Sequence, residues 1–279
     1  MAVYPPSRLK RARATKAEME ERAEFLMAYA TRHAPVTVRQ LFYAATVANV
    51  TGIGKDEAGY CKVQAQVLEL RRTGRLPYHA IADATRWMKK PRSWVSAEDA
   101  LRETARLYRK SLWTGERELE IWLEKDALAG VIAPETTAYD VPLMVTRGFT
   151  SETFAWSTIE GLDPDTVLHV RAFYDFDRSG QDAAASLQEK LERFADAQRK
   201  TVDFKLVALD ADMVQRLRLP TREAKRTTAA DKRWPHDFAA ELDAIPPDML
   251  RGIVRQEIEA LLPADELARL KNIERLERQ

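Results

Sequence analysis

The sequence predicts an α/β protein in two parts, a basic helical part followed by an acidic part built on a mainly parallel β-sheet. Residues 1–92 hold 17 Lys and Arg against 8 Asp and Glu, whereas residues 93–279 hold 27 against 35. In the second part, short apolar runs alternate with helical patterns, which is typical of a parallel sheet with helices on both faces. We therefore expect a basic domain over 1–92, a linker helix over 93–116 and a sheet domain over 117–279.

The basic domain starts with an arm, residues 1–14, and continues with three helical patterns. These patterns cover Lys16–Arg32, a segment that starts at Val38 after the capping box Thr37–Gln40, and Asp56–Arg72. A short β-wing is predicted over Leu76–Thr85, so the whole indicates a winged helix. The third helix would present Lys62, Gln66 and Arg72 outward, as a helix that reads the DNA major groove does. Three-helix units without nucleic acid share the pattern, and solvated charge can also be distributed this unevenly by chance.

The elements of the remaining chain follow from apolar periodicity. The predicted strands are Glu118–Leu123, Pro142–Thr146, Val167–Tyr174 and Val202–Leu209. The predicted helices are Ala97–Lys110, Asp126–Tyr139, Ser151–Glu160, Gln181–Arg199, Asp248–Leu262 and Ala264–Glu277. Residues 216–238 are rich in Arg, Lys and Pro and are expected to be irregular.

Carboxylates follow two of the predicted strands. Asp175 and Asp177 come directly after the apolar run, and in an extended chain residues two apart project to the same face. Gly180 is expected to form a sharp turn before the next helix. Glu124 follows the first strand of the sheet, and the carboxyl ends of parallel strands meet at one edge.

Crowded carboxylates of this kind need a cation. We therefore predict that Glu124, Asp175 and Asp177 hold one or two Mg²⁺ ions for phosphoryl transfer. Lys125 and Arg147 follow the neighbouring strand ends and would bind an anion such as a DNA phosphate. The alternative is that these acids are merely solvated at strand ends.

Other kinds of site are not indicated by the sequence. The single cysteine, Cys61, allows no intramolecular disulfide, and the four histidines are scattered without zinc spacing. No Gly-rich phosphate loop occurs, which argues against an ATP site. No apolar run reaches the ~20 residues of a membrane span, so we expect a soluble, cytoplasmic protein without membrane contact.

Tyr43 is a candidate nucleophile. It lies off the apolar stripe of its predicted helix, and Arg39, one turn earlier, lies on the same flank. A phenol ionises near a pKa of ~10, so a nucleophilic tyrosine needs a cation such as this guanidinium nearby. Local pattern alone favours the alternative, a half-exposed tyrosine at a domain interface.

Several segments together resemble one family. The segments are Thr37–Tyr43, Glu124-Lys125, Val145–Phe149, Asp175–Gly180 and Glu241–Pro246, within residues 35–260. In this order they resemble the topoisomerase VI A subunit and the related meiotic double-strand-break transesterase. The chain is most similar to their short, free-standing mini-A relatives.

The resemblance implies a winged helix followed by a Toprim domain, and an activity of type IIB topoisomerase A-subunit type. Two protomers would bind double-stranded DNA, and Tyr43 of one would attack a phosphate held at the Mg²⁺ site of the other. The result would be a double-strand break through 5′-phosphotyrosyl links, with Arg39 steadying the phosphate and Glu124 assisting the leaving oxygen. In the family the ATPase is a separate B subunit, which would be a further partner.

The chain departs from the family at two positions. Arg178-Ser179 replaces a turn that often contains proline, and Phe42 stands where tyrosine is common. Two other functions remain open from the sequence. One is a Toprim nuclease that uses water and in which Tyr43 is structural, and the other is a DNA-binding or partner-recruiting protein without catalysis.

Overall fold

The computed structural model describes residues 14–82, 91–113, 116–262 and 264–278. Its helical part consists of α1 (Lys16–His33), α2 (Val38–Val47) and α3 (Glu57–Arg72). Helix α2 begins where predicted, because the Thr37 hydroxyl accepts from the Gln40 N–H and the Gln40 side-chain oxygen accepts from the Thr37 N–H. Helix α3 is capped by Asp56, whose carboxylate accepts from the Gly59 N–H. The three helices pack on one another through buried aliphatic side chains.

The predicted wing is not a β-hairpin over the described residues 76–82. A short 3₁₀ helix, η1 (Tyr78–Ala80), follows Pro77, and Ile81 forms an isolated parallel bridge with Val36. Pro77 has no N–H for a strand ladder, and the Ala80 N–H closes a turn onto the Pro77 carbonyl instead. The arm, the rest of the wing and part of the linker lie outside the described residues. The next helix, α4 (Ala97–Leu107), ends three residues before its predicted end.

The second part is an α/β sheet domain, as expected. Strands β1 (Arg117–Leu123), β2 (Leu143–Val145), β3 (Val167–Phe173) and β4 (Thr201–Ala208) form one sheet in the order β2-β1-β3-β4. All three pairings are parallel, and β1 and β3 pair from their first to their last residues. The carboxyl ends of β1 and β3 therefore lie level with each other.

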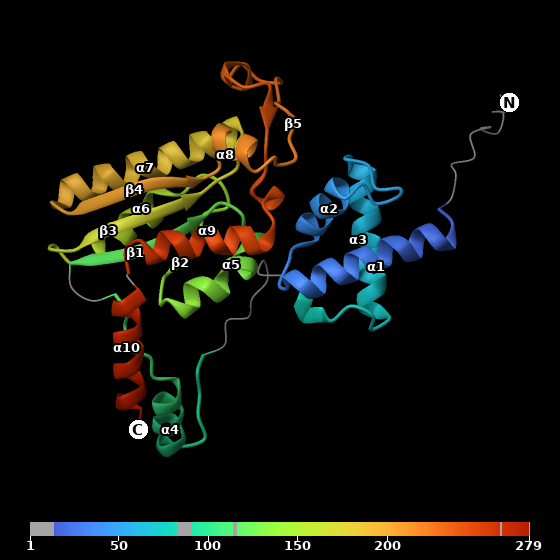
Figure 1. Cartoon of the computed structure of the whole chain (residues 1–279). Helices are drawn as coiled ribbons and strands as arrows, with labels where there is room; N and C mark the ends of the chain where they lie inside the picture. The colour runs from blue at the N-terminus through green and yellow to red at the C-terminus, as the bar shows by residue number, and fades with distance from the viewer. Residues whose placement is uncertain (1–13, 83–90, 114–115, 263, 279) are drawn as a thin grey trace, which may run out of the picture.

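Helices cover both faces of the sheet (Figure 1). This part contains the helices α5 (Asp126–Ala138), α6 (Glu152–Glu160), α7 (Arg178–Gln198), α8 (Ala211–Arg216), α9 (Pro247–Glu259) and α10 (Ala264–Glu277). Of these, α10 extends away from the sheet towards α4 in Figure 1. Trp122 of β1 projects from one face of the sheet, and buried side chains of α6 and α7 pack there. Buried side chains of α5 and α9 pack on the opposite face. No helix within the described ranges has the length and apolar character needed to cross a membrane.

The predicted irregular segment contains a small antiparallel arm. Strands β5 (Arg222–Glu223) and β6 (Phe238–Ala239) pair, and a loop with the 3₁₀ helix η2 (Asp231–Arg233) joins them. We call residues 222–239 the β5–β6 hairpin; it projects beyond the sheet in Figure 1. A further 3₁₀ helix, η3 (Leu242–Ala244), follows it.

The two parts of the chain share one continuous core cluster, which runs from α1–α3 to the α5/α9 face of the sheet. The contact is also polar, because the Gln40 side chain donates to the Ile245 carbonyl and the Thr37 hydroxyl donates to Asp243 at 3.1 Å. Buried Arg251 of α9 donates to the carbonyls of His33 and Pro35. Helix α2 is thereby fixed beside η3, close to the carboxyl ends of the strands.

Candidate functional site

Glu124 and Asp175 lie side by side at the carboxyl edge of the sheet. Glu124 follows β1, its N–H donates to the Phe173 carbonyl, and its Oε2 accepts from the Asp175 N–H at 2.9 Å. Asp175 is buried, and its Oδ1 accepts from the Leu242 N–H at 2.8 Å. The sequence prediction that these two strand ends bring their acids together therefore agrees with the geometry.

The turn after Asp175 differs from the prediction. Helix α7 begins at Arg178, so Asp177 is its N-cap and accepts from the Gly180 N–H at 2.9 Å. Gly180 lies inside the first helical turn, not in a sharp turn before the helix. A glycine is needed for another reason, because a Cβ at Gly180 would lie 2.5 Å from the Asp175 carbonyl oxygen.

Lys125 is the central cation of the site. Its Nζ lies 3.0 Å from Asp175 Oδ2, 3.0 Å from Glu241 Oε2 and 2.9 Å from Asp243 Oδ2. Burial disfavours the charged lysine, but the three carboxylates outweigh burial and raise its pKa. Lys125 thus ties the strand edge to the segment that carries η3.

Two arginines complete the charge balance from different parts of the chain. Arg39 of α2 places Nη1 3.1 Å from Glu241 Oε2, and its guanidinium lies over the Tyr60 ring, 4.8 Å from the ring centre. Arg222 of the β5–β6 hairpin places Nη2 2.7 Å from Asp177 Oδ2. The acids therefore contact cationic side chains from the helical part, the sheet and the hairpin.

These groups surround an open cavity of about 500 Å³, which we call the charged cavity. The residues that carry its charge or an aromatic hydroxyl are Arg39, Tyr60, Lys125, Asp126, Asp175, Asp177, Arg222, Lys225, Glu241 and Asp243. Both signs of charge line the wall, with cations between carboxylates. The carboxylates of such a wall can bind a cation, and its lysine and arginine side chains can bind a phosphate beside that cation.

The carboxylates differ in their affinity for protons. Burial raises the pKa of Asp175 to about 7, although Lys125 opposes the shift. Burial also raises the pKa of Glu124, and the nearby charges of Asp177 and Glu241 add to that shift. Burial would likewise raise the pKa of Glu241, but Lys125 and Arg39 outweigh it, and the pKa is lowered. Negative charge is thus costly at the strand edge, where a cation would be most stabilising.

Three carboxylates suit Mg²⁺ in chemical type, since this ion takes oxygen ligands. Among the described residues, however, no group of three or more His, Cys, Asp and Glu side chains is arranged to hold a metal ion. Lys125 contacts Asp175 and Arg222 contacts Asp177, at the oxygens that a metal would need. Binding of the ion therefore requires these cationic groups to shift.

Tyr43 does not project from the surface as predicted. It is 9% exposed and belongs to the core cluster, because η3 and the segment after it cover the flank of α2 that the apolar stripe leaves open. Burial and the charge of Glu241 raise its pKa to about 12, against the effect of Arg39 and Lys125. Tyr43 lines a separate apolar cavity of about 300 Å³, together with Phe25, Tyr29 and Pro246. Arg39 and Tyr43 are neighbours, as predicted, but they face different cavities.

The predicted DNA contacts of α3 are partly engaged within the chain. Lys62 donates to the Gly52 carbonyl at 2.7 Å. Gln66 donates to the Met19 carbonyl at 2.5 Å and accepts from Arg22. Arg72 is exposed at the end of the helix. Of the predicted contacts on α3, Arg72 is thus the best placed to reach a ligand without breaking a hydrogen bond of the fold.

Arg147 lies at the rim of the strand edge. Its backbone has a φ of 54°, and its Nε lies 3.0 Å from Asp126 Oδ2. The side chain is 61% exposed. Asp126 lines the charged cavity, and Arg147 is adjacent to it.

Sequence reasoning missed four of the charged groups at the site. The sequence places Glu241 and Asp243 in a family-like segment, and Arg222 and Lys225 in a basic irregular stretch. No role at the site is predicted for any of them. The pattern Glu241-Leu242-Asp243 was a usable signal, because it places two carboxylates around a buried leucine. For the two cations, the sequence contained no spacing that relates them to Asp177.

Comparison with known proteins adds little to this geometry. No family model matches the sequence, and no curated protein matches it. Among solved structures, the chain is similar to the sugar isomerase domain of an RpiR transcription factor from Sphaerobacter thermophilus. That match has 14% identity and a TM-score of 0.27, and it covers 64% of this chain and 87% of the other. At this TM-score the likeness carries no argument about fold or function.

Proposed function

We propose that the protein cleaves double-stranded DNA in a divalent-metal-dependent reaction of the topoisomerase VI A-subunit type, with Tyr43 as the nucleophile. The observation that carries the proposal is that Asp175, Asp177 and Arg39 line one charged cavity. Glu124 lies directly behind them, where its carboxylate accepts from the Asp175 N–H. The all-parallel sheet with acids at its carboxyl edge supports the resemblance to a Toprim domain. The capped α2 supports the resemblance around the tyrosine.

Glu124, Asp175 and Asp177 would hold the metal. When bound, Mg²⁺ polarises a phosphoryl oxygen and offsets the charge that develops on it. The groups of this chain then have defined tasks. Arg39 and Lys125 would bind the non-bridging oxygens of the scissile phosphate after exchanging one carboxylate partner each, because both already line the charged cavity.

In the reaction, the Tyr43 hydroxyl gives up its proton and its oxygen forms a bond to phosphorus. The bond between phosphorus and the 3′ oxygen breaks, and that oxygen takes up a proton. The pKa of about 12 opposes the first step, so Tyr43 needs the nearby Arg39 cation and a less buried position. In one chain Tyr43 faces the apolar cavity and not the charged one. As the family resemblance implies, each Tyr43 of a homodimer would serve the charged cavity of the other protomer, after a shift that exposes its hydroxyl.

A second candidate, a nuclease that uses water, is favoured by one specific observation. Tyr43 is 9% exposed and packs in the core, as a structural tyrosine would. In that case the same acids act on an activated water, and the products carry free phosphate ends. The two candidates share the metal site and differ only in the atom that attacks phosphorus.

The two candidates are separated by trapping the intermediate. The protein is incubated with Mg²⁺ and labelled duplex DNA, denatured, and examined for label that migrates with the protein. Wild type and Tyr78→Phe, a control at a tyrosine that is 62% exposed, should retain label. Tyr43→Phe should lose both the attached label and the cleavage, and Asp175→Asn should lose them too. Cleavage without attachment by Tyr43→Phe would establish the water mechanism, and attachment by that variant would rule out Tyr43 as the nucleophile.

A further inference from the structure

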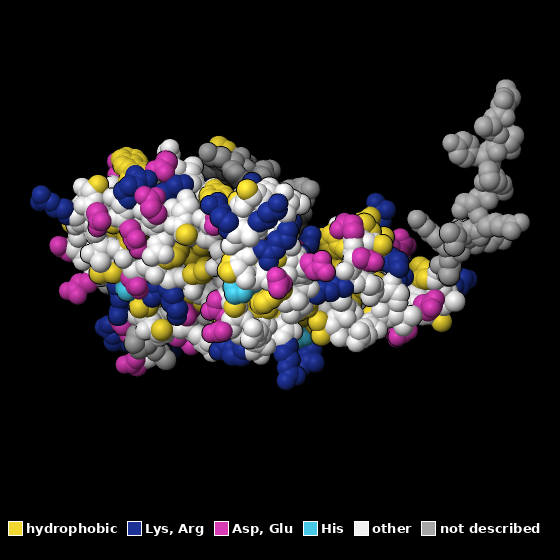
Figure 2. Space-filling model, turned by 90° about the horizontal axis from the view of Figure 1, so that it is seen from above, with side chains coloured by type: hydrophobic (Ala, Val, Ile, Leu, Met, Phe, Trp, Pro, Cys, Tyr) yellow, Lys and Arg dark blue, Asp and Glu magenta, His cyan; other side chains and the backbone are white. Residues whose placement is uncertain are grey.

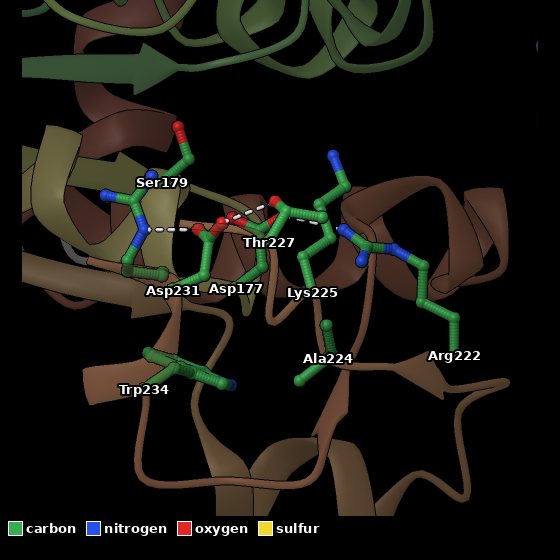
Figure 3. Close-up of a pocket in the computed structure, with 10 residues that line it drawn as sticks. Asp177, Ser179, Arg222, Ala224, Lys225, Thr227, Asp231 and Trp234 are labelled. Carbon is green, nitrogen blue, oxygen red and sulfur yellow. Dashed lines mark hydrogen bonds and ion pairs between the residues drawn. The ribbon is translucent and has the colours of Figure 1, made fainter. Parts of the chain in front are cut away.

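A second cavity adjoins the charged cavity on the far side of Asp177. It has a volume of about 280 Å³ and lies between the start of α7 and the β5–β6 hairpin. Asp177, Arg222 and Lys225 line both cavities, so the two are continuous along one wall. Figure 3 shows the lining side chains, with Ser179 and Lys225 extending to the same side.

The two carboxylates of this second cavity are already neutralised. Asp177 Oδ2 binds Arg222 at 2.7 Å, and its Oδ1 caps α7. Asp231 Oδ1 accepts from Arg178 at 2.8 Å, while its Oδ2 accepts from the Thr227 hydroxyl at 2.8 Å and from the Thr228 N–H. These bonds lower the pKa of Asp231, with the Arg178 bond contributing most. Each of the two acids therefore has a cationic partner within the chain.

Lys225 is the one cationic side chain lining this cavity that has no acidic partner among the described residues. Within the described residues, the Lys225 ammonium group has no hydrogen bond or ion pair. The cavity thus contains three cations, Arg178, Arg222 and Lys225, against two acids. The surrounding segment has the same excess, because residues 216–238 hold seven Lys and Arg against three Asp and Glu. Figure 2 looks onto this side and shows Lys and Arg side chains gathered near the middle of the molecule.

The hairpin that presents Lys225 is held in place. Phe176 stands between Asp175 and Asp177 in the sequence. Its ring packs on Trp234 and Phe238, with ring centres 5.0 and 5.5 Å apart. The backbone of Phe176 exchanges two 2.9 Å hydrogen bonds with Ala240. The position of the hairpin beside Asp175 and Asp177 is therefore set by packing, and the cavity exists before a ligand arrives.

We infer that this second cavity is a subsite for a phosphate of the bound DNA strand, next to the phosphate that is cleaved, and that Lys225 is its main ligand. The inference rests on the proposed function. A single anion would satisfy the surplus charge, but a nucleic-acid strand carries an anion at each nucleotide and can occupy two continuous cavities at once. The Ser179 hydroxyl can donate to the same phosphate. The subsite fixes which phosphate of the strand lies over Asp175 and Asp177.

The subsite is tested by DNA binding without divalent metal, so that cleavage plays no part. Affinity for a labelled duplex is measured by fluorescence polarisation at several salt concentrations, for wild type, Lys225→Ala, Lys225→Arg and Lys232→Ala. Lys232 is an exposed lysine of the same hairpin that does not line the cavity. Loss of one phosphate contact lowers the slope of log affinity against log salt by about 0.9. Between 50 and 200 mM salt, this slope change alters the ratio of wild-type to variant affinity by about threefold.

The expected result is a reduced slope for Lys225→Ala, and wild-type slopes for Lys225→Arg and Lys232→Ala. Equal slopes for Lys225→Ala and Lys232→Ala would overturn the subsite, whatever the covalent-attachment assay shows. Calorimetric titration with inorganic phosphate separates the two sources of the anion. Saturable phosphate binding that is lost in Lys225→Ala, with no change in the DNA slope, would make the cavity a small-anion site and refute the DNA subsite. Failure of wild type to bind DNA would overturn the subsite and the proposed function together.

Discussion

Replacing Lys125 by methionine is expected to destabilise the protein by about 3 kcal/mol. The ammonium group lies 2.9 to 3.0 Å from three carboxylates, and its side chain is 23% exposed. Removing one partner of a buried ion pair costs roughly 3–5 kcal/mol, because the remaining charge stays buried without compensation. Partial exposure of Lys125 places the cost at the lower end. Methionine keeps the apolar length of the side chain, so the change tests charge and not packing.

The assay is thermal unfolding by circular dichroism near neutral pH. For a chain of this size, 1 kcal/mol corresponds to roughly 2–4 °C, so the midpoint should fall by about 6–12 °C. Lys205→Met is the matched control, because Lys205 forms one ion pair with Glu257 and is 53% exposed. An exposed pair contributes at most about 1 kcal/mol.

Acid should remove the difference between the Lys125→Met variant and wild type. Without the lysine, Asp175 and Glu241 lose a charge that lowers their pKa values. Those pKa values rise in the folded protein, so the folded variant binds more protons than the unfolded chain. Its stability is then greatest at low pH and falls as the pH rises through those raised pKa values. The reasoning is refuted if Lys125→Met melts no lower than Lys205→Met, or if its deficit persists below about pH 4, where carboxylates are protonated.

Two further predictions concern single residues, Glu120 of the sheet and Gly180 of the turn after Asp177. Burial raises the pKa of Glu120 to about 7, against the effect of its hydrogen bond from Trp122, so wild-type stability should fall as pH rises from 4.5 through that value. Glu120→Gln should therefore raise the unfolding free energy by about 3 kcal/mol above neutral pH and leave it unchanged in acid. An equal effect in urea titrations at both pH values would contradict this. Gly180→Ala should abolish the proposed DNA cleavage and lower the melting temperature, because its Cβ would meet the Asp175 carbonyl oxygen at 2.5 Å. Gly252→Ala, in a helix with nothing within 4 Å of the new Cβ, should be neutral or stabilising, and similar behaviour of the two variants would refute the steric argument.

Local signals in the sequence were sufficient for most elements. Thr37, Asp56 and Ser151 are N-caps that mark where their helices begin, and the apolar runs that end at Leu123 and Phe173 became neighbouring parallel strands. Such signals depend on hydrogen bonds and periodicity within a few residues. They placed Glu124 and Asp175 together because parallel strands of equal register bring their ends level.

Long-range contacts were not predictable in the same way. Tyr43 lies off the apolar stripe of α2, yet η3, about 200 residues later, covers that flank and buries it. Gln66 was expected to face DNA, but Arg22 of α1 reaches it across the helix pair. Arg222 reaches Asp177 from a segment without periodicity. Each of these contacts depends on where a distant segment folds back, which hydrophobic patterning does not encode.

The site is completed by the part of the chain that follows the sheet. Asp175 accepts a hydrogen bond from the Leu242 N–H, and Lys125 pairs with Glu241 and Asp243. These partners come more than thirty residues after the end of β4. During synthesis, a chain that has formed all four strands still lacks these partners. The turn that carries Asp175 and Asp177 therefore reaches its final geometry only when the hairpin and η3 have been added. A truncation after β4 would leave the strands of the sheet and its acids without the partners that hold Asp175 and Lys125 in place.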